Sequence, residues 1–238
     1  MTKKKLGIIG GMGPWATAYT FNEIVRLTKA ETDADHIHIL IDNNTTIPDR
    51  TKAICGDGKS PIAEIANSLK VMQKWGADLV IIPCNTTHYY FEEIQSLTDI
   101  KILNIIEITA AACKKKYGRA CCGILATKGT IITNLYQEEL TSKDIPYVTP
   151  KSENIKHIMQ FIYDYVKGNK TPDDGLSIIK PVLDEMVLRG AEYFVLGCTE
   201  LSVLTGLKIN NVYSFVDSSL ELVKAAITEC GYFVREIH

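Results

Sequence analysis

Short apolar runs alternate with longer amphipathic segments along nearly the whole chain. The runs are rich in Val, Ile and Leu and are bounded by glycine, proline or polar residues, which is typical of buried strands. Strands that alternate with helices favour parallel sheets with both faces covered. We expect strands at 6–10, 36–43, 79–84, 102–106, 121–127, 146–148, 193–198 and 212–215.

The amphipathic segments predict helices. The segment 62–75 carries apolar residues at Ile62, Ile65, Leu69 and Met72, a helical period, and Gly76 is expected to end it as a left-handed cap. The other expected helices are 14–30, 87–96, 107–117, 130–140, 154–167, 172–189, which Pro181 should kink or divide, and 218–230.

One phrase occurs twice in this pattern, at residues 76–84 and 190–198. In each copy a glycine ends an amphipathic segment, and an apolar run leads to a cysteine eight positions later, Cys84 or Cys198. The equal spacing indicates two related half-structures, each placing a thiol at the carboxyl end of a strand, where ligands sit in such sheets.

The expected fold is therefore α/β, with two pseudo-symmetric domains. Each domain is a mainly parallel sheet flanked by helices, and the active site lies in the cleft between them. We expect an N-terminal domain of residues 1–106 plus 214–238, carrying Cys84, and a C-terminal domain of residues 107–213, carrying Cys198.

Composition supports an ordered domain protein and excludes several classes of function. Of 238 residues, 46% are hydrophobic and 23% charged, enough apolar residues for a sizeable core. The net charge of −2 does not indicate the basic surface that binds nucleic acid, and no apolar stretch is long enough to span a membrane. The N-terminal run is too short and glycine-rich for a signal sequence, so we expect a cytoplasmic protein.

The seven cysteines are irregularly spaced and contain no Cys-x-x-Cys, so we expect free thiols and no metal site. Polar residues that suit a helix N-cap follow both Cys84 and Cys198. A helix N-terminus would lower the pKa of a thiol and offer N–H groups to a substrate carboxylate. For either cysteine alone, a buried core residue is the favoured explanation. Two at repeated strand ends favour a function.

A glycine-rich turn at residues 10–14 follows the first strand. It is either a tight strand-to-helix turn or a close approach to a ligand. Read as Gly11-x-Gly13-x-x-Ala16, it also fits a loose dinucleotide fingerprint with Asp42 as the ribose partner, although proline after the third glycine weakens that match.

Three further side chains are candidate functional residues that also have ordinary structural explanations. Arg50, in the polar loop 43–51, is a clamp for a carboxylate or a solvated arginine. Lys167 is by itself a lysine at a helix C-terminus. His88 is expected to orient a loop by hydrogen bonding rather than to act as a base.

At residues 10–17, 48–51, 83–88 and 196–201, the chain resembles the aspartate racemase branch of the aspartate/glutamate racemase superfamily. The resemblance covers essentially the whole length. It implies a cofactor-independent racemase that interconverts L- and D-aspartate, or glutamate, with Cys84 and Cys198 as the two bases. It also implies a small-molecule amino-acid substrate and a homodimer.

The same resemblance implies a substrate-binding set. Asn85, Thr86 and Thr199 would hold the α-carboxylate, and Arg50 and Lys167 the side-chain carboxylate. Thr87 stands where alanine is common in the family and would alter the pocket slightly. The remaining members are Met12, Asp49 and Thr51.

Rival functions are distinguished by simple measurements. A nicotinamide-dependent dehydrogenase would change the absorbance or fluorescence of its cofactor. A non-catalytic amino-acid-binding protein would be stabilised by its ligand without exchanging the α-proton. A related cysteine-dependent isomerase on the same scaffold would take another acid.

Overall fold

The computed structural model describes residues 2–168, 170–209 and 211–235, and the chain forms two compact units. Unit 1 ends at Ile105 and resumes at Ser219, and unit 2 is Ile106–Ser218. The chain thus returns to unit 1 at residue 219 rather than 214. The reason is the last strand, β8 (Phe215–Asp217), which pairs in parallel with β7 (Tyr193–Gly197) of unit 2.

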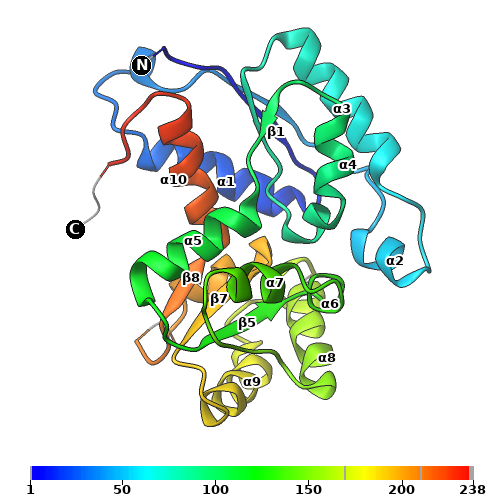
Figure 1. Cartoon of the computed structure of the whole chain (residues 1–238), viewed down its shortest axis with the longest axis vertical. Coiled ribbons are helices and arrows are strands. Elements are labelled where there is room, and N and C mark those ends of the chain that lie inside the picture. Colours follow the sequence, from blue (N-terminus) through cyan, green and yellow to red (C-terminus); the bar gives the residue numbers. More distant parts are fainter. Residues whose placement is uncertain (1, 169, 210, 236–238) are drawn as a thin grey trace. The chain divides into compact units, whose positions relative to one another are not determined.

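Unit 1 contains a four-stranded parallel sheet in the order β2-β1-β3-β4. The central strands β1 and β3 are fully buried, which explains why they read as unbroken apolar runs. Figure 1 shows α3 and α4 beside this sheet. The strands are β1 (Leu6–Ile9), β2 (Ile39–Asp42), β3 (Leu79–Ile81) and β4 (Lys101–Ile102), and the helical elements are α1 (Pro14–Leu27), η1 (Asp33–Asp35), α2 (Arg50–Cys55), α3 (Ile62–Trp75), η2 (Asn85–Tyr90) and α4 (Phe91–Ser96).

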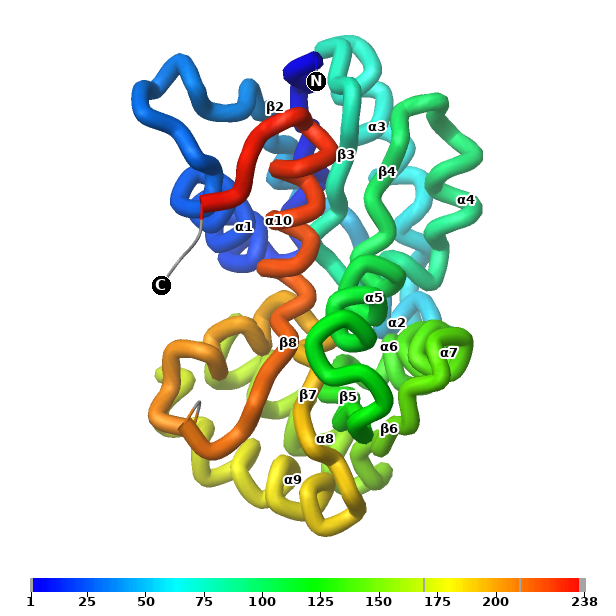
Figure 2. The backbone as a smooth tube through the Cα atoms, turned by 60° about the vertical axis from the view of Figure 1, so that its left-hand side comes forward, coloured from blue at the N-terminus to red at the C-terminus, as the bar shows by residue number. Residues whose placement is uncertain are grey.

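Unit 2 repeats this topology with a parallel sheet in the order β6-β5-β7-β8. Its strands lie side by side in Figure 2, with β5 and β7 at the centre. In each unit, the second of its four strands in sequence order lies at an edge of the sheet, and the third pairs with the first. The elements not yet given are α5 (Ile105–Tyr117), β5 (Cys122–Ala126), α6 (Lys128–Ile132), α7 (Leu135–Ser142), β6 (Tyr147–Val148), α8 (Ser152–Gln160), the π-helix η3 (Phe161–Val166), α9 (Leu176–Leu188), η4 (Thr199–Gly206) and α10 (Ser218–Glu229).

Each thiol of the repeated phrase borders the hydrophobic core of its own unit. Cys84 packs with a core that includes Leu69 and Val80, and Cys198 with one that includes Leu183. Burying such aliphatic side chains contributes roughly 1.5–3 kcal/mol each. Each thiol therefore lies at a packed apolar core.

Three local features differ from the expected elements. Asn134 adopts a left-handed conformation (φ 57°) and divides the expected helix 130–140 into α6 and α7. Pro181 stays inside α9, which is one helix. The loop expected at 43–51 is followed by α2, a short helix that ends at Gly56 in the left-handed region. By contrast, α3 has the predicted bounds, and Gly76 caps it with φ 78°.

The last helix and the segment after it pack onto unit 1. Lys101 forms a 2.9 Å ion pair with Glu229, the N–H of Lys4 donates to the carbonyl of Cys230, and Thr28 forms an antiparallel bridge with Val234. These contacts place α10 and the residues that follow it in unit 1.

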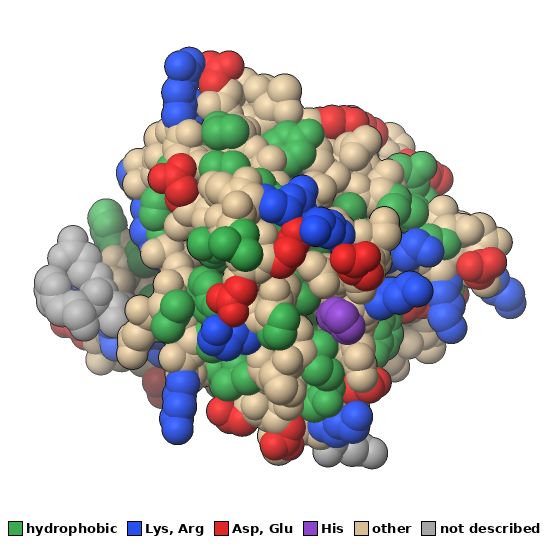
Figure 3. Space-filling view, turned by 90° about the horizontal axis from the view of Figure 1, so that it is seen from below, with side chains coloured by type: hydrophobic (Ala, Val, Ile, Leu, Met, Phe, Trp, Pro, Cys, Tyr) green, Lys and Arg blue, Asp and Glu red, His purple; other side chains and the backbone are tan. Residues whose placement is uncertain are grey.

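The surface in Figure 3 mixes basic, acidic and hydrophobic side chains on one face, without a basic patch there. Within residues 2–168, 170–209 and 211–235, no helix combines the length and apolar character needed to cross a bilayer.

Candidate active site

Cys84 lies just beyond the carboxyl end of β3, as the N-cap residue of η2. Its backbone is extended (φ −153°, ψ 107°), and only 7% of the residue is exposed. The N–H of Cys84 bonds the carbonyl of Ile82 at 2.7 Å, which turns the chain sharply after the strand. This turn places the thiol at the rim of the sheet.

His88 fixes the backbone around Cys84. Its Nδ1 lies 2.9 Å from the carbonyl oxygen of Cys84, and the N–H of Ile105 donates to Nε2 at 3.3 Å. The proton is therefore assigned to Nδ1, which donates to Cys84. Burial lowers the pKa of His88, so the ring is neutral. The expected loop-orienting role of His88 is confirmed.

The three residues after Cys84, namely Asn85, Thr86 and Thr87, are buried in the first turn of η2. The hydroxyl of Thr87 lies 3.2 Å from Sδ of Met12. This contact ties η2 to the glycine-rich turn that contains Met12.

Arg50 is held at the same rim of unit 1. Its guanidinium donates to the carbonyls of Met12 (2.6 Å), Pro48 (3.0 Å) and Ile47 (3.3 Å), and the residue is 92% buried, with 8% exposed. These acceptors fix its position. The alternative of a solvated loop arginine is wrong.

Asp49 and Thr51 flank this arginine in α2. The carboxylate of Asp49 accepts a 2.8 Å hydrogen bond from the N–H of Lys52, so Asp49 caps the helix that begins at Arg50. Thr51 is half-buried. Both residues thus lie next to Arg50 in unit 1.

Chain packing accounts for the glycine-rich turn. Gly11 has φ +88°, and a Cβ there would lie 2.3 Å from the main-chain carbon of Asn44. A Cβ on Gly10 would lie 2.3 Å from the side chain of Thr17, whose hydroxyl accepts from the N–H of Gly11. The tight turn is therefore confirmed, and these contacts supply a reason for the glycines without a dinucleotide.

Cys198 occupies the equivalent place in unit 2. It directly follows β7, is the N-cap residue of η4, and has a similar extended backbone (φ −144°, ψ 129°). Only 6% of it is exposed. Thr199 begins η4 and is buried.

A buried carboxylate beside Cys198 was missed in the sequence. Glu200 is 3% exposed, and its Oε2 lies 3.0 Å from Sγ of Cys198 and 3.3 Å from Oγ1 of Thr199. Its Oε1 forms a 3.0 Å ion pair with Nζ of Lys167, at the end of η3. One signal was present in the repeat: the second residue after the thiol is acidic here but is Thr86 in the first copy.

This carboxylate changes the electrostatics of the thiol. Burial and the negative charge of Glu200 raise the pKa of Cys198 well above its ordinary value, and the ammonium of Lys167 opposes them only partly. The expectation that a helix N-terminus lowers the pKa is therefore wrong for Cys198, because desolvation and a like charge outweigh the backbone dipoles.

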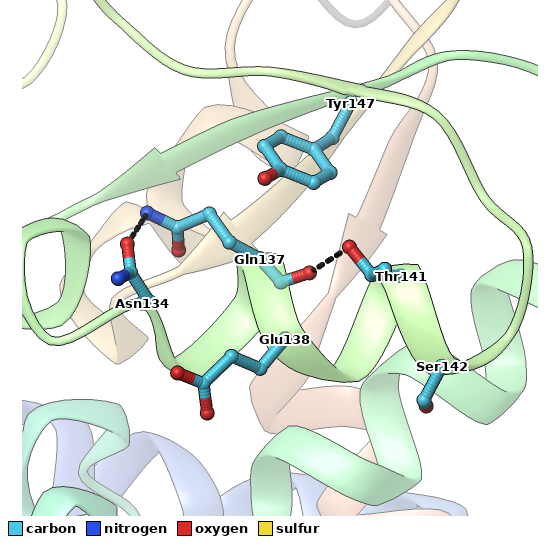
Figure 4. Close-up of a pocket in the computed structure, with 6 residues that line it drawn as sticks. All are labelled: Asn134, Gln137, Glu138, Thr141, Ser142 and Tyr147. Atoms are coloured by element: carbon cyan, nitrogen blue, oxygen red, sulfur yellow. Dashed lines mark hydrogen bonds between the residues drawn. The ribbon is translucent and has the colours of Figure 1, made fainter.

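A separate surface pocket of about 450 Å³ lies in unit 2 (Figure 4). Gln137 donates to Asn134 at 3.1 Å there, and Thr141 donates to the main chain of Gln137 at 2.7 Å. None of its lining residues belongs to the predicted site. They are Asn134, Gln137, Glu138, Thr141, Ser142 and Tyr147.

Comparison with known proteins gives a consistent result. The Asp/Glu/Hydantoin racemase family matches residues 9–226. A broad specificity amino-acid racemase, RacX of Bacillus subtilis (strain 168), is 26% identical over 94% of this chain and 96% of its own length.

Solved structures share the fold. The aspartate racemase of Picrophilus torridus has a TM-score of 0.86 and 31% identity, covering 97% of this chain and 96% of that one. Glutamate racemase RacE1 of Bacillus anthracis shares the fold at a TM-score of 0.71 and 16% identity, covering 97% and 84%. The chain therefore belongs to the Asp/Glu/Hydantoin racemase family, as an isomerase that does not depend on pyridoxal phosphate.

Proposed function

We propose that this racemase interconverts L- and D-aspartate, with glutamate as the alternative acid, by proton transfer between Cys84 and Cys198. The observation that carries the proposal is the equivalence of the two thiols. Each follows the third strand of a four-stranded sheet with the same order, each has an extended backbone, and each caps a 3₁₀ helix.

The chemistry needs one thiolate and one thiol. The thiolate takes the α-proton, so the C–H bond breaks and an S–H bond forms, leaving the electron pair on the α-carbon. The other thiol then delivers its proton to the opposite face, and its sulfur keeps the S–H electron pair. Protons balance, and the configuration inverts without an oxidant or reductant.

The carbanion-like charge needs fixed donors, because an amino acid's α-proton is a very weak acid. We assign Asn85, Thr86 and Thr199 to the α-carboxylate. Each is buried next to a thiol. Their donors would lie beside the oxygen atoms on which negative charge develops.

Arg50 and Lys167 are assigned to the side-chain carboxylate of the substrate. Arg50 offers a planar cation held by three carbonyl groups, suited to bidentate binding. Lys167 is tied to Glu200, so a substrate carboxylate must share or replace that partner. Met12, Asp49, Thr51 and Thr87 complete the proposed set by holding Arg50 and η2 in place.

The relatives favour acidic substrates without choosing one. They include an aspartate racemase, a broad specificity amino-acid racemase and glutamate racemases. We place aspartate first because of the 31% identity with the Picrophilus torridus enzyme.

Solvent exchange tests the mechanism. The protein is incubated in deuterium oxide with each enantiomer of aspartate and of glutamate, without added cofactor, and deuterium at the α-carbon and optical rotation are followed. We expect racemisation by the wild type and its loss in Cys84→Ser and Cys198→Ser. Cys55→Ser, at the end of α2, is the control. Wild-type racemisation by either of the first two variants would refute the two-thiol mechanism.

Two wider expectations accompany the function. The resemblance implies a homodimer, which light scattering after size exclusion would detect. A cytoplasmic location remains a prediction that fractionation of cells would test.

A further inference from the structure

The two halves of the repeat differ beside their thiols. The second residue after Cys198 is Glu200, whereas the second after Cys84 is the neutral Thr86. Glu200 is 97% buried and accepts the hydrogen bond of the Cys198 thiol at 3.0 Å. An acidic group at such depth is costly unless it has partners, and here they are a thiol, a hydroxyl and an ammonium.

We propose that Glu200 is a positioning residue that keeps Cys198 protonated in the resting enzyme, so that Cys198 is the proton donor and Cys84 the acceptor in the first turnover. The roles of donor and acceptor rest on the proposed function. The effect of Glu200 on the protonation of the Cys198 thiol is independent of that function, and it can be measured without a substrate.

The physical basis is the pair of charged groups that act on Cys198 within unit 2. The carboxylate of Glu200 accepts the S–H and repels a thiolate, which favours the neutral thiol. The ammonium of Lys167 lies on the other carboxylate oxygen and opposes this effect. Glu200 and burial prevail over Lys167, whose ammonium contacts the other oxygen of the carboxylate.

The arrangement also makes the reverse role accessible. After Cys198 gives its proton to the α-carbon, its thiolate lies beside the carboxylate of Glu200. The ammonium of Lys167 limits that repulsion, so the state is disfavoured but reachable. Lys167 therefore sets how strongly the resting state is biased.

The parameter kcat/KM cannot report this bias. Two enantiomers have equal free energy, so kcat/KM must be the same in both directions at every pH. The test must therefore read the thiol itself.

The experiment measures alkylation of Cys198 by iodoacetamide as a function of pH, with the modified peptide quantified by mass spectrometry. Limited access of the reagent slows the reaction at every pH but does not move its midpoint, which reports the pKa of the thiol. In Glu200→Gln we expect a lower midpoint and about a tenfold faster reaction at pH 8, the change that one pKa unit produces. In Lys167→Met we expect the opposite, a higher midpoint and slower reaction.

The opposite shifts expected for Glu200→Gln and Lys167→Met distinguish an electrostatic effect from a loss of structure. A variant that merely loosened the fold would react faster in both cases. Glu200→Asp retains the charge and should keep the midpoint nearer that of the wild type. Glu153→Gln removes an exposed carboxylate from the first turn of α8 and should change nothing.

The possible outcomes separate the two claims. An unchanged midpoint in Glu200→Gln, or a shift of the same sign in both variants, overturns the inference about Glu200. If the midpoints shift in opposite directions but the protein racemises neither aspartate nor glutamate, Glu200 controls the protonation of Cys198 and the proposed function is wrong.

Discussion

The guanidinium of Arg50 donates a 2.6 Å hydrogen bond to the main-chain carbonyl of Met12, so α2 is joined to the turn that follows β1. The bond connects a cation to a backbone atom rather than to a flexible side chain. If Arg50 binds the substrate as proposed, a guanidinium fixed in this way reduces the ordering cost of binding.

Replacing Arg50 by lysine should therefore harm binding more than folding. An ammonium group cannot donate in the planar fork that reaches Met12 and Pro48. We expect KM for aspartate to rise by about 10- to 100-fold, as expected for a lost charged hydrogen bond. Steady-state kinetics measures this. Arg119→Lys, at an exposed arginine, should leave KM unchanged.

Thr87→Ala should have a mild effect on stability. The hydroxyl of Thr87 donates to the thioether sulfur of Met12, and sulfur is a weak acceptor. We expect the free energy of unfolding in urea to change by less than about 1 kcal/mol. The ratio of kcat/KM for aspartate to that for glutamate should change, because η2 is released from Met12. An unchanged ratio would exclude Thr87 from specificity.

Gly11→Ala should destabilise unit 1 strongly. The residue combines a positive φ with a Cβ position 2.3 Å from the main chain of Asn44. Gly118 provides a matched control, because it has φ +63° but nothing within 4 Å of its Cβ position. We expect Gly118→Ala to lower the free energy of unfolding by about 1–2 kcal/mol, the cost of the left-handed backbone alone. Gly11→Ala should cost clearly more, and equal losses would show that the contact with Asn44 relaxes freely.

His88 should make stability depend on pH in mildly acidic solution. Burial lowers the pKa of its imidazole below the ordinary value of 6.5. Below that pH the unfolded chain binds a proton that the folded protein excludes, so the free energy of unfolding falls as the pH falls. The slope from this group is at most about 1.4 kcal/mol per pH unit. Urea unfolding between pH 7 and pH 5 should show a shallower slope for His88→Asn, whereas His157→Asn, at an exposed site, should retain the wild-type slope.

Sequence patterns predicted the parts of the fold that depend on local spacing. The helical period at residues 62–75 gave α3 with its observed bounds, and the repeated phrase placed Cys84 and Cys198 at equivalent strand ends. Both signals work because burial imposes a period on the chain.

The patterns failed where a single backbone angle or a distant partner decides the structure. The left-handed Asn134 interrupts a helix whose apolar period continues through it. The ion pair of Lys167 with Glu200 joins residues from different elements, and only folding brings them together. The sequence likewise predicts only a polar loop around Arg50, because α2 is too short to show a period.

The shared order β2-β1-β3-β4 and β6-β5-β7-β8 has an evolutionary consequence. A pair of identical half-length ancestors would carry the same neighbour two positions after each sulfur. Because both halves are parts of one chain, each can mutate independently, and the second has Glu200 where the first has Thr86. One chain can therefore surround two matched thiols with different side chains, which two copies of a single half could not do.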